Sequence, residues 1–142
     1  MVTERDAMTD VRSVRDGLLT VSSTFGPSLT VAEALAAFEN PKLHMLLITE
    51  HGRLLGTLTR PDLADAEPGP ALPWSSLAPE RLVLPDDRLS AVRRSMLAAG
   101  QRRRAVVGAD GSLLGLLCLK RHGRDFCSDA DVAARRAERE LG

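Results

Sequence analysis

The sequence contains few of the residues that stabilise disulfide-rich or membrane-spanning proteins. Only two of its 142 residues are cysteine, and its aromatic residues are one tryptophan, three phenylalanines and no tyrosine. Two cysteines without metal-ligand spacing form no disulfide framework, so we expect free thiols in a reducing compartment. The longest apolar runs, 45–48 and 113–119, are far shorter than the roughly 20 residues that cross a bilayer. The sequence therefore predicts a soluble, cytoplasmic protein with an aliphatic core and no membrane partner.

A surplus of charge of either sign is also missing. Lys and Arg together number 19, as do Asp and Glu, so the formal net charge is zero. A protein that coats nucleic acid normally has a basic surplus, and we therefore expect no nucleic-acid partner. The first ten residues are polar and lead into no apolar stretch, which argues against a signal peptide and predicts an irregular N-terminus.

Motifs for catalysis and metal binding are absent as well. No serine stands in a nucleophile elbow, no Walker loop is present, and the three histidines have no metal-binding spacing. We expect no enzymatic activity, no catalytic residue, no metal site and no required cofactor.

What the sequence does contain is an internal repeat. The seven residues GRLLGTL that begin at Gly52 recur as GSLLGLL from Gly111. A short apolar strand precedes each copy, at 45–48 and 105–107, and glycine suits the hairpin turn because it tolerates positive φ. Each half of the chain is therefore expected to contain a strand, a tight turn and a second strand.

An amphipathic helix is expected before each hairpin. Apolar residues at i, i+3, i+4 and i+7 predict a helix over 31–38, with Thr30 and Glu33 forming a capping box at its start. The same spacing predicts a helix from Leu89 that ends at Gly100. The repeat offset is 58 residues through the helices and 59 through the hairpins, so we place one extra residue in the second helix-to-strand loop.

Each repeat is expected to begin with a short strand before its helix and to end with a short helix after its hairpin. In the first repeat this closing helix is expected over 61–66. The predicted fold is α/β (α+β), with two tandem β-α-β-β-α repeats packed as one pseudo-twofold unit. The expected division of the chain is an irregular N-terminus at 1–10, a first repeat at 11–66, a linker at 67–73, a second repeat at 74–126 and a C-terminal helix at 127–142.

The first repeat contains a series of short motifs in a fixed order and spacing: Val14-Arg15-Asp16, Pro27, 30–35 (TVAEAL), the turn at 52–56 and 56–62 (GTLTRPD). By these residues it resembles a known family, the CBS (cystathionine-β-synthase-type) domain. The second copy begins near Trp74, and the resemblance extends over residues 11–122. The sequence is therefore similar to a tandem CBS-domain pair, or Bateman module.

This resemblance implies a regulatory function. Bateman modules fold as one unit, often form homodimers, and in many cases bind adenosine-type ligands in the clefts between their repeats. By this likeness the chain would bind AMP, ADP, ATP or S-adenosylmethionine and signal the occupancy to a partner protein. The alternative is a ligand-free module for structural dimerisation or scaffolding.

Thr59 and Asp62 match the ligand-binding positions that the resemblance implies. Thr59 ends a strand just before Pro61 opens a helix, where a hydroxyl and the helix-start amides suit a phosphate oxygen. The Asp62 carboxylate would accept hydrogen bonds from the two ribose hydroxyls. Both residues also favour helix starts, so the alternative is that they only cap the helix.

Further candidate contacts lie in the neighbouring strands. By the resemblance, adenine would lie in a slot lined by Thr24, His44, Met45 and Leu46. Arg60 would supply a counter-charge to a phosphate. The alternative for His44 is a strand-edge histidine without a ligand contact.

The second repeat departs from the family pattern. Cys118 stands where the first repeat has Thr59, and Arg121 stands where it has Asp62. A thiol bonds phosphate poorly and arginine accepts no hydrogen bond, so the second cleft is not expected to bind a nucleoside in the usual manner. The altered second motif favours scaffolding, whereas the intact first motif favours ligand sensing, which we take as the main hypothesis.

Arginines gather before the second central strand. Residues 102–104 are all arginine, and we align them with 43–45. Together with Arg121, the residues Arg102, Arg103 and Arg104 would form a cationic cluster around a phosphate chain or another anion. The alternative is a solvated strand entrance, because charge runs usually face water.

Overall fold

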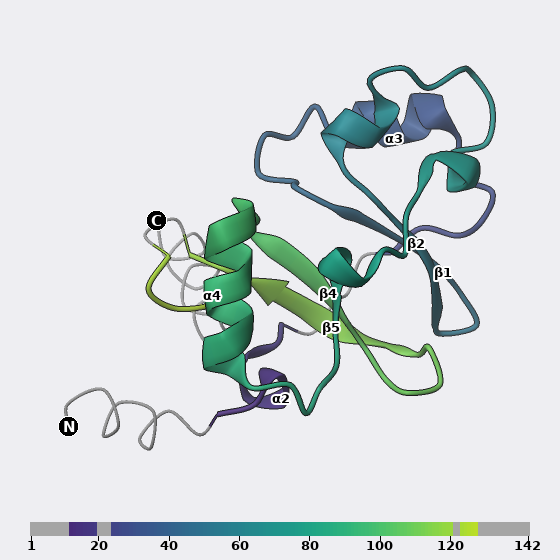
Figure 1. The fold of residues 1–142 in the computed structure, drawn as a ribbon. Coiled ribbons are helices and arrows are strands. Elements are labelled where there is room, and N and C mark those ends of the chain that lie inside the picture. The colour runs from purple at the N-terminus through teal and green to yellow at the C-terminus, as the bar shows by residue number, and fades with distance from the viewer. Residues whose placement is uncertain (1–11, 20–23, 121–122, 128–142) are drawn as a thin grey trace, which may run out of the picture.

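The computed structural model describes residues 12–19, 24–120 and 123–127. The irregular N-terminus expected at 1–10, Arg121, and the expected C-terminal helix apart from Cys127 lie outside these residues. The described chain forms two mixed α and β units, one from each half, at the upper right and lower left of Figure 1. None of the helices in the described ranges has both the length and the apolar character needed to cross a membrane.

The first unit is built on a two-stranded hairpin. Strand β1 (Leu46–Glu50) pairs antiparallel with β2 (Arg53–Leu58), and Phe25 forms a parallel bridge to Ile48 in β1. Helix α3 (Val31–Ala37) lies in the chain between this bridge and the hairpin. The order of strand, helix, strand and strand is the one predicted.

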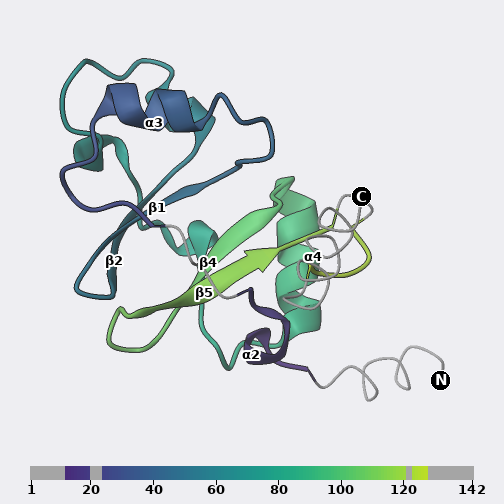
Figure 2. The ribbon, with the colours of Figure 1, turned by 180° about the vertical axis from the view of Figure 1, so that it is seen from behind.

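The second unit repeats this order. Strand β3 (Leu82–Val83) pairs parallel with β4 (Arg103–Val107), which pairs antiparallel with β5 (Leu113–Cys118). Helix α4 (Leu89–Ala99) packs against this sheet, as Figures 1 and 2 show. The remaining elements are the short helix α2 (Val14–Gly17) and the 3-10 helices η1 (Arg60–Leu63), η2 (Leu72–Trp74) and η3 (Pro79–Arg81).

The pairing register corrects one detail of the repeat alignment. Leu46 pairs with Leu58 in the first hairpin, and Arg104 pairs with Leu117 in the second. Since Leu58 and Leu117 are equivalent positions of the repeated segment, Arg104 matches Leu46 and not Met45. The extra residue therefore lies in the second hairpin turn, where unpaired residues absorb an insertion without shifting the strand ladder.

Local hydrogen bonds set the ends of the helices. The Thr30 hydroxyl accepts from the Glu33 amide at 3.1 Å and the Glu33 carboxylate accepts from the Thr30 amide at 3.0 Å, which confirms the predicted capping box. Gly100 ends α4 at a φ of 68°, a left-handed conformation that glycine adopts without strain. The helix expected over 61–66 is instead a run of 3-10 turns, because amides there bond to carbonyls three residues back.

The segment that leads each repeat pairs with the hairpin of the other repeat. Leu19 and Leu116 exchange backbone hydrogen bonds of 2.7 and 2.9 Å, which joins the segment before the first repeat's helix to β5. Ser76 and Thr57 exchange two bonds of 2.9 Å, which joins the segment after η2 to β2. Val14 is accordingly buried in the core of the second unit. Each unit is thus completed by chain from the other half.

The two units meet along their hairpins. The Leu54 amide donates to the Gly111 carbonyl at 3.0 Å, and the Leu113 amide donates to the Gly52 carbonyl at 2.9 Å. These bonds join equivalent residues of the two repeats, so the contact has pseudo-twofold symmetry. An apolar cluster fills it, made of Leu47, Leu54 and Ala105 with the partly buried Met45, Leu82, Val107, Leu113 and Leu116.

Candidate functional site

A cavity of about 390 Å³ opens between the two units. Small-molecule sites typically occupy roughly 300–1,000 Å³, so this volume suits a nucleoside-sized ligand. The lining comes from the entrances of β1 and β4, the segment after β2 and the end of η3. The lining residues are His44, Met45, Thr59, Pro61, Arg81, Gly100, Gln101, Arg102 and Arg103.

The Asp62 carboxylate is bonded to two of these lining residues. Its Oδ2 accepts from the Thr59 amide at 2.8 Å and from the Thr59 hydroxyl at 3.0 Å. Arg81 donates to both carboxylate oxygens, at 2.7 and 2.8 Å. The exposed fractions of the Arg81 and Asp62 side chains are only 19% and 16%. Asp62 therefore caps η1 and also forms a bidentate, mostly buried ion pair.

This geometry determines the ionisation of the pair. Burial raises the pKa of Asp62, but the hydrogen bonds from Arg81 and Thr59 outweigh it, and the net pKa lies below its ordinary value. The hydrogen bond to Asp62 raises the pKa of the Arg81 guanidinium above its ordinary value. Both groups are therefore charged at neutral pH.

The pair predicts a contribution to stability that disappears in acid. Because the folded-state pKa of Asp62 lies below its ordinary value of 3.8, the unfolded chain takes up this proton first as the pH falls. The stabilisation is therefore present above that value and is lost as the pH falls through the folded-state pKa. Urea unfolding of the wild type and of Asp62→Asn between pH 7 and pH 3 should give two stability curves that converge in acid. Curves that stay parallel would contradict the ion pair.

Two further guanidinium groups line the cavity. Arg102 Nε donates to the Leu119 carbonyl at 3.3 Å, and Arg103 Nη1 donates to the Arg102 carbonyl at 3.0 Å. Since both acceptors are backbone carbonyls, neither bond neutralises a positive charge. Burial is the main reason that the pKa of Arg103 lies below its ordinary value. The cavity wall is therefore positively charged.

His44 responds to this positive charge. Burial lowers the pKa of its imidazole, and the charges of Arg103, Arg102 and Arg60 lower it further. The imidazole is therefore mostly neutral at pH 7. A bound anion would offset the arginines and raise the pKa of His44.

Several predicted contacts lie outside the cavity lining. Thr24 is exposed, and Leu46 is buried in the core of the first unit. The Arg60 guanidinium donates to the carbonyls of Phe38 and Asn40 at 2.9 and 2.8 Å and lies 5.0 Å from the centre of the Phe38 ring. Arg60 thus binds the chain at the end of α3.

The predicted cationic cluster is only partly assembled in the described residues. Arg104 is buried and donates to Gln101 Oε1 and Ser95 Oγ, both at 2.9 Å, so it anchors α4 to β4. Arg103 does line the cavity. The structure thus gathers His44, Met45, Thr59 and Arg103 from the predicted set, and Asp62 joins them through Thr59 and Arg81.

Arg81 is the main residue that the sequence reasoning missed. Phe25 and Val83 occupy equivalent parallel bridges in the two units. Arg81, two residues before Val83, therefore matches Ser23, the neighbour of the predicted contact Thr24. The repeat offset, applied to the residues around Thr24, would have pointed to Arg81 in the second repeat.

A scan against protein families matches residues 8–69 to the CBS domain. The match covers the first of the two repeats and less than half of the chain. A comparison with curated protein sequences finds no match.

Solved structures show that the fold extends over both halves. The structure of CBSX2 in complex with AMP is 22% identical, with a TM-score of 0.64, and the match covers 89% of this chain and 98% of that one. The CBS domains of a transcriptional regulator from Streptococcus pneumoniae are 19% identical, with a TM-score of 0.64 and coverage of 77% and 94%. A CBS domain pair/ACT domain protein from Thermotoga maritima is 16% identical, with a TM-score of 0.57 and coverage of 89% and 97%. The predicted mixed fold of a CBS-domain pair is confirmed.

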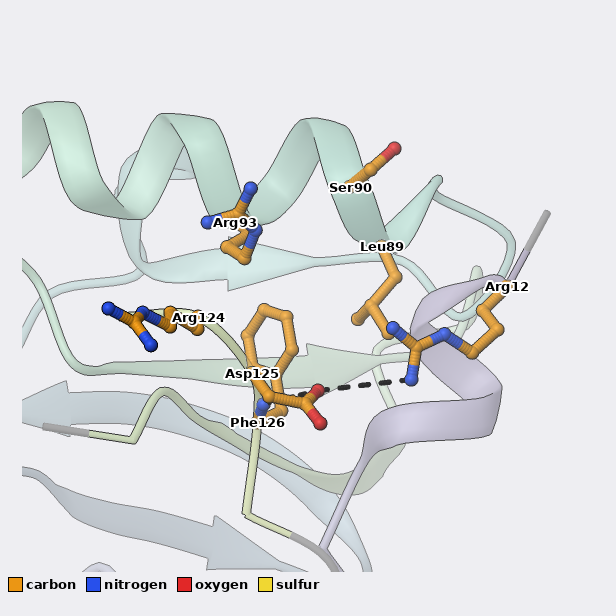
Figure 3. A pocket seen from close by; sticks show the side chains of 7 residues that line it. All are labelled: Arg12, Leu89, Ser90, Arg93, Arg124, Asp125 and Phe126. Carbon is orange, nitrogen blue, oxygen red and sulfur yellow. Dashed lines mark hydrogen bonds and ion pairs between the residues drawn. The ribbon is translucent and has the colours of Figure 1, made fainter. Parts of the chain in front are cut away.

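The second repeat has smaller cavities beside its helix. One of about 130 Å³, shown in Figure 3, lies between α4 and residues 124–126. Arg12 forms an ion pair of 3.8 Å with Asp125 across it, and Arg93 donates to the Gly123 carbonyl at 3.0 Å. In the described ranges, no three His, Cys, Asp or Glu side chains gather where they could hold a metal ion.

Proposed function

We propose that this CBS-domain pair is a regulatory module that binds an adenosine-type ligand in the cavity between its repeats. The ligand is AMP, ADP, ATP or S-adenosylmethionine, and its occupancy is signalled to a partner protein. The observation that carries the proposal is a cavity of about 390 Å³ between the repeats. Its wall combines Thr59 with the arginines at the end of η3 and at the entrance of β4.

Three features of the cavity support this ligand class. The lining arginines supply positive charge, and the Thr59 hydroxyl can donate to a phosphate oxygen once it releases Asp62. Met45 adds apolar surface against which a base can pack. The solved structure of CBSX2, which shares this fold, is a complex with AMP.

The role is regulatory rather than catalytic, and it needs a second state. A ligand shifts a protein's behaviour only if it binds two conformations or assemblies with different affinities. We propose that a homodimer, or a complex with an effector protein, provides the second state. Sedimentation of the protein with and without AMP tests this, because a regulatory ligand should alter the assembly or its affinity for a partner.

One observation favours the alternative, a ligand-free scaffolding module. Arg81 already occupies the Asp62 carboxylate, which would otherwise receive the ribose. Thermal unfolding distinguishes the two functions, because a nucleotide raises the free energy of unfolding only of a module that binds it.

The experiment is a titration with AMP, ATP and S-adenosylmethionine by calorimetry, with a thermal unfolding series beside it. A ligand at 100 times its dissociation constant should add about 2.7 kcal/mol to the free energy of unfolding. Asp62→Ala should abolish or greatly weaken binding, whereas Asp65→Ala, an exposed carboxylate just beyond η1, should not. The absence of binding by every compound, or binding that Asp62→Ala leaves unchanged, would contradict the proposal.

A further inference from the structure

The Asp62 carboxylate has only one acceptor position left while Arg81 is bound to it. An ionised carboxylate offers about four lone-pair positions, two on each oxygen. Its Oδ2 accepts from the Thr59 amide, the Thr59 hydroxyl and Arg81, and its Oδ1 accepts from Arg81. The bonds from Thr59 are part of the cap of η1, whereas those from Arg81 come from η3, outside the first repeat's hairpin. A ribose diol donates two hydrogen bonds, so both of its hydroxyls can bond this carboxylate only if Arg81 moves away.

Moving Arg81 breaks its ion pair with Asp62 and leaves only the weaker influence of the Glu80 charge on its guanidinium. The side chain is 19% exposed, so water replaces the lost carboxylate poorly. The described residues that line the cavity include Arg102 and Arg103 but no carboxylate. A neutral nucleoside brings no new partner for Arg81, whereas a phosphate accepts two of its N–H groups in the same bidentate manner.

The surroundings favour a ligand that brings negative charge. Arg81, Arg102 and Arg103 all line one cavity. Burial lowers the pKa of His44 in the same lining, and the charges of Arg103 and Arg102 lower it further. A phosphate is attracted by these positive charges, whereas the sulfonium of S-adenosylmethionine is repelled.

We propose that Arg81 is a specificity-determining residue that makes this cavity select phosphorylated nucleosides over neutral nucleosides and over S-adenosylmethionine. The inference rests on the proposed function, because it requires the cavity to bind an adenosine compound. On binding, Arg81 exchanges Asp62 for the ligand's phosphate, and Asp62 becomes free to accept from the ribose. The phosphate and the diol are thereby recognised together.

The test compares AMP with adenosine by calorimetry, for the wild type and for Arg81→Gln. The wild type should bind AMP more tightly than adenosine by a factor on the order of 10 to 100, the range expected for hydrogen bonds to a charged group. S-adenosylmethionine should bind more weakly than AMP. In Arg81→Gln the ratio of the two affinities should fall roughly tenfold, because AMP loses a partner while adenosine no longer has to displace one.

Two further variants separate this role from a structural one. Arg94→Gln removes an exposed arginine from α4 and should leave both affinities unchanged. Arg81→Lys keeps the positive charge but cannot span both carboxylate oxygens. It should therefore retain affinity for AMP and gain affinity for adenosine. Arg81→Lys also keeps the test available if Arg81→Gln does not fold.

The outcomes distinguish this inference from the proposed function. If Arg81→Gln weakens AMP and adenosine by the same factor, or if the wild type binds both equally, Arg81 does not set specificity, although the cavity still binds adenosine compounds. If the wild type binds none of the three compounds, both the inference and the proposed function are overturned.

Discussion

Replacing Gly115 by alanine is expected to lower the free energy of unfolding by about 3 kcal/mol, at the upper end of the usual effect of overpacking. A Cβ at this position would collide with the Leu19 carbonyl oxygen and with Leu18 Cδ1, which would lie at 2.7 Å. The Leu19 carbonyl cannot simply turn away, because it accepts the Leu116 amide at 2.9 Å. Urea unfolding at neutral pH measures the loss.

Two other glycines provide matched controls for this prediction. A Cβ at Gly26 would meet nothing within 4 Å, so Gly26→Ala should change stability by no more than about 0.5 kcal/mol. At Gly56, the repeat counterpart of Gly115, the Cβ would meet the Ser75 side chain. Rotation of the Ser75 side chain moves its Oγ but not its Cβ, which would lie at 2.6 Å, so Gly56→Ala should also destabilise the protein. Equal stability of the Gly115 and Gly26 variants would contradict the crossing of the leading segment over β5.

Asp62→Ala is expected to lower the free energy of unfolding by about 3 kcal/mol. This is the usual cost of removing one partner from a mostly buried ion pair. The change removes the cap of η1 and leaves the Arg81 guanidinium without its carboxylate. Thermal or urea unfolding measures the loss, and Asp65→Ala serves as the control because its side chain is exposed.

A double-mutant cycle separates the two causes of this loss. Adding Arg81→Gln to Asp62→Ala removes the uncompensated cation, so the double variant should be less destabilised than the sum of the single variants. Strictly additive losses would mean that the two side chains do not interact in solution.

The elements of the fold could be predicted because each is encoded by a short pattern. Short apolar runs with glycine turns predicted the hairpins, and the Thr30–Glu33 capping box placed the start of α3. The crossing of the leading segments could not be predicted in this way. Since the two repeats have the same pattern, the sequence alone does not say which hairpin Leu19 or Ser76 joins.

The candidate site was predictable only where its residues are close in sequence. Thr59 and Asp62 stand three residues apart, and both the motif and the capping geometry pointed to them. Arg81 lies 19 residues beyond Asp62, so only the tertiary arrangement brings the two together. Arg60 is adjacent to Thr59 in the chain, yet its guanidinium bonds to carbonyls at the end of α3, where a helix leaves acceptors unpaired.

The central claim is that the cavity between the repeats holds a phosphorylated adenosine compound. A crystal structure of the protein grown with AMP tests it most directly. The account predicts electron density for AMP between Thr59 and Arg103, with Arg81 turned from Asp62 to the phosphate. Density for AMP at another place, or an empty cavity with the Arg81–Asp62 pair intact at saturating AMP, would contradict the account.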